Sequence, residues 1–327
     1  MERNLRKLIV VIYMTLISLL YIQIIPLTMA QGTLEITLYT NKPEYFLGDT
    51  LNIYGYVYNN GSLVSDALVG LEVDDPTNHE LILRTLQIGV APTNQEIEII
   101  SAYPSDQWGK PKDSFKRGEF AYFNITVRNN NDTEAKNFLI TLTAFDSAQG
   151  IIDSSWVRLT LNPLCKVSVI IPIYILEKAA TGKAIVYANT FNELPKNGGT
   201  PLSIEKSTTF TITSSSSSYA TSSGTISSTP GLYYTTFKVP LYQPIGTYTI
   251  YATCKYANQV TAAQKTVIFK VPDLNNDNKV NVLDLIIVSR DIGWEGPPGG
   301  IISDLNKDGK VNILDIILVA RSLGWEA

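Results

Sequence analysis

Two twelve-residue segments near the end of the chain carry acid and amide side chains at alternate positions. They read DLNNDNKVNVLD (273–284) and DLNKDGKVNILD (304–315). Ca2+ takes about six to eight oxygen ligands, and a twelve-residue loop offers them from positions 1, 3, 5, 7, 9 and 12, with a backbone carbonyl at position 7. This pattern predicts two Ca2+ sites. Their ligands would be Asp273, Asn275, Asp277, Lys279, Asn281 and Asp284 in the first loop, and Asp304, Asn306, Asp308, Lys310, Asn312 and Asp315 in the second.

The sixth position of each loop, where the chain must turn sharply, holds a suitable residue. It is Gly309 in the second loop and Asn278 in the first, and both residue types tolerate the left-handed backbone region. Alignment of residues 273–294 with 304–325 gives 14 identities in 22 positions, and every predicted ligand has the same type in both copies. A single such segment also occurs as a plain polar turn. Two copies in the same register favour metal binding.

No helix is predicted before either loop, although each loop runs directly into a helical pattern. Residues 261–272 are strand-like, and residues 293–303 are rich in glycine and proline. A calcium sensor of the EF-hand type changes the angle between helices on both sides of its loop, so this arrangement does not favour a sensor. A loop followed by a helix, present twice, resembles the type I dockerin module over residues 272–327. The resemblance implies a compact calcium-dependent domain that docks onto a cohesin domain of another protein.

Two faces of each predicted helix are apolar. One face contains Leu285, Val288 and Ile292, and its counterpart contains Ile316, Val319 and Leu323; we expect these residues to form the small core. A domain of this size buries only one such face well, so the other is predicted to bind the partner. Its residues are Val282, Leu283, Ile286, Ile287 and Arg290, and then Ile313, Leu314, Ile317, Leu318 and Arg321. The alternative is that this second face packs on the preceding β region.

The acidic loops are expected to make the module depend on its metal. Residues 272–327 contain nine Asp or Glu and five Lys or Arg, hence a net charge of −4. Without Ca2+ the ligand carboxylates repel one another, so we expect folding of the module to be coupled to Ca2+ binding. Loop positions 10 and 11 hold aliphatic residues in both copies, whereas some dockerins have Ser or Thr there. The cohesin specificity of those dockerins is therefore not expected here.

The residues before this module are predicted to form β-strands, because apolar and polar side chains alternate between turn signals. The phrase TNKPEYFLGDTLNIYGYV resembles the start of immunoglobulin-like or macroglobulin-like modules of cell-surface proteins, and residues 93–213 resemble the adhesion-related β-sandwich of surface proteins. The predicted fold is mainly β. It consists of tandem immunoglobulin-like β-sandwiches at residues 31–92 and 93–213, followed by a small all-α calcium-binding dockerin module.

Two segments between the sandwiches and the dockerin-like module have distinct compositions. Residues 214–230 are rich in Ser and Thr, which predicts a flexible linker or a long exposed loop. The strands expected in residues 231–271 are few for a free-standing sandwich. They form either a short third domain or the closing strands of an earlier sandwich into which the second β block is inserted.

The N-terminus predicts export. Residues 1–30 combine a basic start, an apolar run and the small-residue site of a signal peptide, with a retained membrane anchor as the alternative. No second apolar stretch of spanning length follows, so the mature chain is expected outside the membrane, secreted or attached to a cell surface. Cys165 and Cys254 are expected to be buried thiols at strand positions, with a disulfide as the alternative.

Several function classes are not favoured by the composition. The net charge of −4 and the low content of charged residues, 17%, exclude a broad nucleic-acid-binding surface. His79 is the only histidine and is expected to be a solvated surface residue, so no Ser-His-Asp, Cys-His or His-based zinc site is predicted. The adjacent Asp74 and Asp75 are expected to form a polar turn rather than a catalytic pair. The sequence therefore predicts a non-catalytic protein that joins an extracellular assembly through a cohesin.

A component of a polysaccharide-degrading complex is the alternative, either as a glycoside hydrolase accessory or as a carbohydrate-binding subunit. Tyr54, Tyr56 and Tyr58 on one strand face have the amphipathic rings that stack on sugars. Cross-strand packing is the simpler interpretation of these tyrosines.

Overall fold

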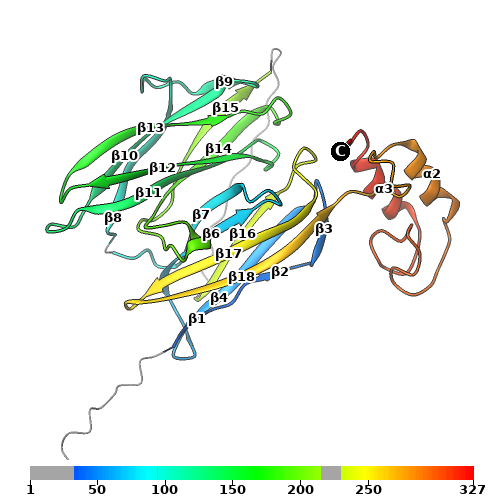
Figure 1. The fold of residues 1–327 in the computed structure, drawn as a ribbon, viewed down its shortest axis with the longest axis horizontal. Coiled ribbons are helices and arrows are strands. Elements are labelled where there is room, and N and C mark those ends of the chain that lie inside the picture. Colours follow the sequence, from blue (N-terminus) through cyan, green and yellow to red (C-terminus); the bar gives the residue numbers. More distant parts are fainter. Residues whose placement is uncertain (1–32, 94, 215–229) are drawn as a thin grey trace, which may run out of the picture. The chain divides into compact units, whose positions relative to one another are not determined.

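The computed structural model describes residues 33–93, 95–214 and 230–327. Strands dominate up to residue 270, and two short helices follow, which confirms the prediction of a mainly β fold with a small helical C-terminal segment (Figure 1). The predicted signal peptide and residues 215–229 of the predicted linker lie outside the described residues. No helix within the described ranges is long and apolar enough to cross a membrane.

One pair of facing sheets is built from strands at both ends of the β region. The first sheet has the order β1-β4-β16, with β2 and β5 also paired to β4, and the second has the order β3-β18-β17-β6-β7. The bounds in the first sheet are β1 Leu34–Ile36, β2 Tyr39–Thr40, β4 Thr50–Asn59, β5 Ser62–Leu63 and β16 Leu232–Lys238; those in the second are β3 Glu44–Phe46, β6 Asp66–Asp74, β7 Glu80–Gly89, β17 Gly246–Tyr256 and β18 Gln259–Lys270. Alternate residues of β4, among them Leu51, Ile53 and Val57, are fully buried between the sheets, as their spacing predicts.

The strands that follow residue 230 belong to this first pair of sheets. β16 pairs antiparallel with β4, and β17 pairs antiparallel with β6. These pairings are those of closing strands, one of the two arrangements that the sequence leaves open. We propose that residues 34–89 and 231–270 form one domain and that the intervening β block is inserted into it.

The second pair of sheets is formed entirely by residues 97–213. One sheet has the order β13-β10-β8 and the other β12-β11-β14-β15-β9. The bounds are β8 Ile97–Ser105, β9 Ser114–Lys116, β10 Phe120–Asn129, β11 Lys136–Phe145, β12 Ile151–Leu161, β13 Lys166–Tyr174, β14 Gly182–Phe191 and β15 Lys206–Thr213. The predicted inward positions are all fully buried: Phe123, Ile125 and Val127 on β10, and Phe138, Ile140 and Leu142 on β11.

The two pairs of sheets pack against each other, so that β6 and β11 are buried on both faces. The backbone N–H and C=O of Leu83 both bond to the Thr143 hydroxyl, at 2.9 and 3.0 Å. Leu83 also joins Phe191 in a small apolar cluster. A side chain at Gly70 would place its Cβ 2.8 Å from Thr253 Oγ1 on β17 and 2.9 Å from the Phe191 ring, so the neighbouring strand and the inserted block together require glycine there.

Lys196 lies among three carboxylates at this junction. It belongs to the short 3-10 turn η1 (Pro195–Asn197), whereas Glu72 and Asp74 are on β6 and Glu80 is on β7. Its Nζ is 3.2 Å from Asp74 Oδ2 and 3.5 Å from Glu72 Oε1 and also bonds to Glu80, while its backbone N–H donates to Glu72 Oε2 at 2.8 Å. Burial raises the pKa of Glu72 to about 8, and the nearby Asp74 carboxylate adds to the rise. One lysine of the inserted block thus contacts three acids of the domain proposed for residues 34–89 and 231–270.

The two cysteines are free thiols in different surroundings. Cys254 is buried on β17, and burial raises the pKa of its thiol to about 12. Cys165 is exposed and precedes β13. The expectation of a buried thiol at a strand position therefore holds for Cys254 and is wrong for Cys165, because that residue lies in the turn between β12 and β13 rather than on a strand.

Candidate metal-binding and docking site

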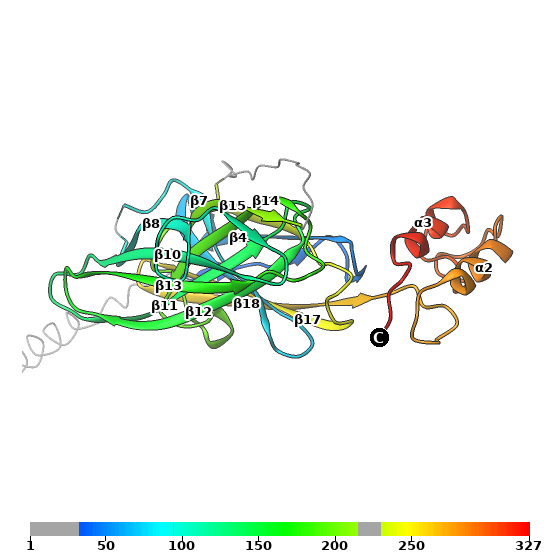
Figure 2. The same cartoon turned by 90° about the horizontal axis from the view of Figure 1, so that it is seen from above.

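The C-terminal segment contains the helices α2 (Val282–Arg290) and α3 (Ile313–Arg321), which lie side by side (Figure 2). Each helix begins directly after its acidic loop, and no helix precedes either loop within the described residues. Asn281 and Asn312 cap the two helices, and in each case the acid three residues later completes a capping box. The acidic loops are therefore joined rigidly to the helices that follow them.

The two loops have the same internal hydrogen bonds. In the first, the Asp273 carboxylate accepts from the N–H groups of Asp277 (3.2 Å) and Asn278 (2.9 Å), and Asp277 Oδ1 accepts from Lys279 N–H (2.9 Å). In the second, the equivalent distances are 3.1, 3.0 and 2.9 Å, from the carboxylates of Asp304 and Asp308. Asn278 and Gly309 have φ values of 64° and 83°, the left-handed conformation expected at the sixth position.

The last acid of each loop is fully buried and holds both ends of the loop together. Asp284 Oδ1 accepts from Leu274 N–H (2.7 Å) and Asn275 N–H (3.3 Å), and its Oδ2 accepts from Asn281 N–H (2.8 Å). Asp315 makes the same three contacts in the second loop. These carboxylates are therefore fixed in place, and each oxygen of a carboxylate can accept more than one partner.

The residues of both loops fit Ca2+ by the chemistry of their donors. Each loop offers three carboxylates, two amide oxygens and a backbone carbonyl, which are hard oxygen ligands of the kind that Ca2+ prefers. No group of three or more His, Cys, Asp or Glu side chains gathers as a metal cluster within the described part of the chain. The match of each loop to Ca2+ therefore needs its amide oxygens as well as its carboxylates. In this structure the amide nitrogens of Asn275 and Asn306 donate to Asp277 and Asp308 of the same loops, both at 2.8 Å.

Each loop is also bonded to the end of the other repeat. Val280 in the first loop exchanges two backbone bonds with Gly324 and Trp325, both 2.9 Å, and Val311 in the second exchanges two with Gly293 and Trp294, at 2.9 and 3.0 Å. Two salt bridges of 3.1 Å, Lys279–Glu326 and Lys310–Glu295, flank these pairings. The two repeats are thus one interlocked unit, around a core of Leu274, Val280, Val288, Val311 and Val319.

The predicted core face of the helices is only partly buried. Val288 and Val319 are fully buried, and Leu285 and Ile316 are half-buried. Ile292 and Leu323, however, are 54% and 44% exposed, so the prediction that they belong to the core is wrong. The helices end at Arg290 and Arg321, and the chain then turns at glycines with positive φ, so the helical spacing no longer applies to these two residues.

The second predicted face is largely open to solvent. Six of its aliphatic side chains are exposed, from 42% for Ile286 to 62% for Val282 and Ile313. Ile287 and Leu318 are half-buried, and the arginines at the helix ends are exposed. The structure therefore leaves an apolar surface on two equivalent helices, which we call the docking face: Val282, Leu283, Ile286, Ile313, Leu314 and Ile317.

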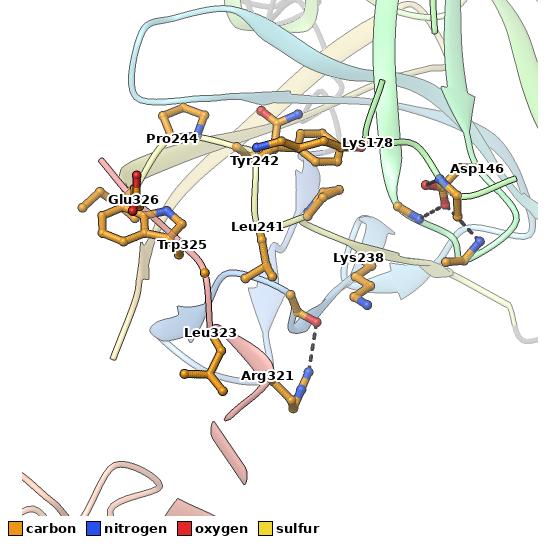
Figure 3. A pocket seen from close by; sticks show the side chains of 18 of the residues that line it. Asp146, Lys178, Lys238, Leu241, Tyr242, Pro244, Arg321, Leu323, Trp325 and Glu326 are labelled. Carbon is orange, nitrogen blue, oxygen red and sulfur yellow. Dashed lines mark hydrogen bonds between the residues drawn. The ribbon is translucent and has the colours of Figure 1, made fainter. Parts of the chain in front are cut away.

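A cavity of about 790 Å3, shown in Figure 3, was not expected from the sequence. Its wall contains residues 240–245, the turn at residues 146–150 and the C-terminal residues 323–327. Asp146 is bound to the backbone N–H groups of Ala148, Gly150 and Ala180, at 2.8 to 2.9 Å. Asp146 thus holds the turn, the other acid of the wall, Glu326, pairs with Lys279, and Arg321 in the same wall donates to the carbonyl of Gly48 at 3.0 Å.

The remaining candidate residues of the sequence have structural roles. Asp75 Oδ1 accepts from Thr77 and His79 N–H, which is the polar turn that was predicted, but Asp74 faces the Lys196 cluster. His79 is exposed, as expected, and its Nε2 lies 3.0 Å from Asp153 Oδ1 on β12. This hydrogen bond raises the pKa of His79 above its ordinary value. The buried cluster was not predictable from the sequence, because Glu72 and Asp74 occupy ordinary strand positions.

Comparison with known proteins identifies the C-terminal segment. Residues 271–324 match the model of the dockerin type I domain, so the prediction of a C-terminal dockerin is confirmed. Type I dockerins bind calcium and are non-catalytic modules that dock onto cohesins in extracellular complexes. No protein of curated function matches the chain.

Among solved structures, the likenesses are distant. The C-terminal domain of Wzt is 10% identical, with a TM-score of 0.29, over 37% of this chain and 75% of that domain. The alkylpurine DNA glycosylase AlkC of Pseudomonas fluorescens is 12% identical, with a TM-score of 0.27, over 36% of this chain and 31% of the glycosylase. A β-glucosidase from Listeria innocua is 12% identical, with a TM-score of 0.25, over 38% of this chain and 16% of the enzyme.

Proposed function

We propose that this protein is a secreted, non-catalytic modular protein that joins an extracellular assembly. Its dockerin binds two Ca2+ ions and docks onto a cohesin-bearing partner. The observation that supports this most is the docking face, six exposed aliphatic side chains on two equivalent helices that begin at the acidic loops.

The loops hold the metal and thereby position the helices. In the first loop the side chains of Asp273, Asn275, Asp277 and Asp284 would bind Ca2+, with the carbonyl of Lys279 and a contribution from Asn281. The second loop would use Asp304, Asn306, Asp308 and Asp315, with the carbonyl of Lys310 and a contribution from Asn312. Bound Ca2+ offsets the repulsion among the loop carboxylates. Since Asp284 and Asp315 also cap the helices, the same side chains couple the metal to the helix N-termini.

The docking face supplies the contact with the partner. Exposed contiguous aliphatic side chains are costly in water and usually mark an interaction surface. Arg290 and Arg321 at the helix ends add polar contacts at its rim, and Ile287 and Leu318 extend it where they are exposed. The β region would then be the cargo, with immunoglobulin-like sandwiches of the kind found in adhesion proteins. The alternative, a carbohydrate-binding subunit of a polysaccharide-degrading complex, uses the same dockerin and differs only in a glycan-binding surface on the β region.

Capture by cohesins tests this proposal. The full chain, immobilised through its N-terminus, is incubated with a panel of recombinant type I cohesin domains in Ca2+ and in EGTA. We expect capture of a cohesin in Ca2+ only, and its loss when Val282 and Ile313 are both replaced by Asp. Val260→Asp is the matched control, because Val260 is 55% exposed on β18, away from the docking face. Capture that persists in EGTA, or in the double variant, would refute the proposed docking surface.

A further inference from the structure

Five tyrosines lie together on the outer face of the first sheet. Tyr54, Tyr56 and Tyr58 alternate along β4 with the buried residues of its inner face. In the strand register, Tyr54 is directly opposite Tyr39 on β2 and directly opposite Tyr234 on β16. Three tyrosines therefore form a row across three adjacent strands. We call the set Tyr39, Tyr54, Tyr56, Tyr58 and Tyr234 the tyrosine face.

The rings of the tyrosine face are accessible and partly aligned. Tyr39 and Tyr234, at the two ends of the row, are 44% and 45% exposed, and the three tyrosines of β4 are half-buried. The Tyr39 and Tyr54 rings are neighbours, with centroids 5.5 Å apart and planes inclined by 31°. The Tyr56 and Tyr58 rings are 6.3 Å apart and inclined by 41°.

The polar groups of the tyrosine face are mostly unused. Tyr234 Oη lies 3.4 Å from Asn52 Oδ1, which also accepts from the Thr236 hydroxyl at 2.9 Å. The other four tyrosine hydroxyls have no hydrogen-bond partner within the described residues. Each of these four rings thus offers an apolar surface and a free hydroxyl, the combination that makes tyrosine frequent where one side of a contact is apolar and the other is polar.

Charge is absent from the middle of the tyrosine face. Glu35 pairs with Tyr58 at one end, and Lys238 pairs with Thr50 at the other. The positions between them are neutral, so an anionic polymer would find no cluster of cations to neutralise it. A pyranose ring, by contrast, has an apolar C–H face that packs on an aromatic ring and equatorial hydroxyls that bond to neighbouring polar groups. The neutral tyrosine face matches that chemistry.

The spacing of the row favours a chain of sugars over a single one. Adjacent strands lie about 4.8 Å apart, so the backbone positions of Tyr39, Tyr54 and Tyr234 repeat at nearly the length of one sugar unit in an extended polysaccharide. The ring centroids of Tyr39 and Tyr54 are 5.5 Å apart, which is close to the same repeat. We propose that the tyrosine face binds a neutral, linear polysaccharide that runs across β2, β4 and β16. This inference rests on the carbohydrate-binding alternative proposed above and assigns a site to it, and it requires neither Ca2+ nor the docking face.

A second group of exposed aromatic residues provides the control. Phe120, Tyr122 and Tyr174 lie on β10 and β13 of the inserted block, and Phe120 is 50% exposed. The Phe120 and Tyr174 rings meet edge to face, at 62° and 5.2 Å, and so do not present parallel flat surfaces. The two rings therefore pack on each other. The Phe120→Ala variant removes an exposed aromatic ring and leaves the tyrosine face unchanged.

Affinity electrophoresis of the full chain tests the proposal. The gels contain soluble xylan, glucomannan, mixed-linkage β-glucan or, as the anionic comparison, polygalacturonate, and all are run with EGTA. We expect retardation by at least one neutral polysaccharide. Replacement of Tyr39 and Tyr234 by Ala should weaken it by roughly tenfold or more, because two stacking surfaces are lost. The variant with Phe at both positions should bind the polysaccharide more tightly than the Ala variant, because it keeps the two aromatic rings.

Four results would overturn the proposal. They are no retardation by any neutral polysaccharide, retardation by polygalacturonate alone, unchanged binding in the Ala double variant, and equal loss of binding in Phe120→Ala. Sedimentation of the same proteins tests a second copy of the chain as the occupant. A dimer that dissociates on replacement of Tyr39 and Tyr234 by Ala would assign the tyrosine face to self-association instead.

Discussion

Replacement of Glu72 by Gln should remove a pH dependence that the junction imposes on stability. Glu72 is fully buried on β6, and its pKa is raised from 4.5 to about 8. An acid with a raised pKa in the folded state favours folding fully below its unfolded pKa, and this contribution is lost as pH rises through the folded pKa. Folding therefore requires Glu72 to take up a proton throughout the range between pH 4.5 and 8.

The magnitude follows from the two pKa values. Between pH 4.5 and 8 the free energy of unfolding should fall by a few kcal/mol, because Glu72 and the adjacent Asp74, whose pKa is also raised by burial, lose protons as a pair in this range. Gln has the shape of the protonated acid and keeps an oxygen for the N–H of Lys196, which donates to Glu72 at 2.8 Å. We expect the variant to match the natural protein near pH 5 and to be more stable by several kcal/mol at pH 8.

Urea unfolding at pH 5, 6.5 and 8, at constant Ca2+ and ionic strength, measures this difference. The exposed Glu35→Gln is the control for removing one negative charge, and it should leave the pH slope unchanged. The reasoning about Glu72 would be refuted if its Gln variant kept the same slope as the natural protein, or if it were destabilised equally at all three pH values.

Other perturbations have equally direct readouts. Lys196→Met should lower the free energy of unfolding by about 3–5 kcal/mol at neutral pH in urea titrations, since removing the cation leaves buried acids unpaired; an effect below about 1 kcal/mol would contradict the cluster. Phe191→Ala should cost about 3–5 kcal/mol in the same assay, because it opens a cavity between the two domains, and full stability would show that the contact is weak. The only histidine gives a single NMR titration, in which His79 should titrate above its ordinary pKa of 6.5 and return toward it in Asp153→Asn. The contribution of the His79–Asp153 ion pair to the free energy of unfolding should be fully present below pH 6.5 and should be lost as pH rises through the raised pKa of His79. Removal of Ca2+ with EGTA should change the fluorescence of Trp294 and Trp325, which contact the dockerin core, and Asp284→Ala with Asp315→Ala should abolish that change; identical spectra with and without Ca2+ would contradict coupled folding.

The features that were predictable from the sequence are those that local spacing determines. The acidic loops, the helices that follow them and the duplication are encoded within about thirty residues, so they are readable without knowledge of the fold. Strand alternation likewise identified the inner face of β10 and β11, including Phe123 and Ile140. Ile292 and Leu323 were misplaced because helical spacing was extended past the actual helix ends.

The features that were not predictable depend on contacts between distant segments. Strand β6 is buried on both faces, and Glu72 and Asp74 give no sign that a lysine more than a hundred residues later will meet them. The pairing of β16 with β4 joins residues on either side of the entire inserted block. A row of three tyrosines across three strands is likewise visible only once the register is known.

The proposed insertion also affects the order in which the chain can fold as it is made. The inserted block is complete once residue 213 has been synthesised, whereas β4 and β6 must wait for β16 and β17. During that interval the first strands have unpaired edges, which are the usual sites of aggregation in a nascent chain. The early folding of the inserted block would give β6 and β7 a surface to pack on before their own sheet is closed. The block can therefore serve as a template for the domain that surrounds it.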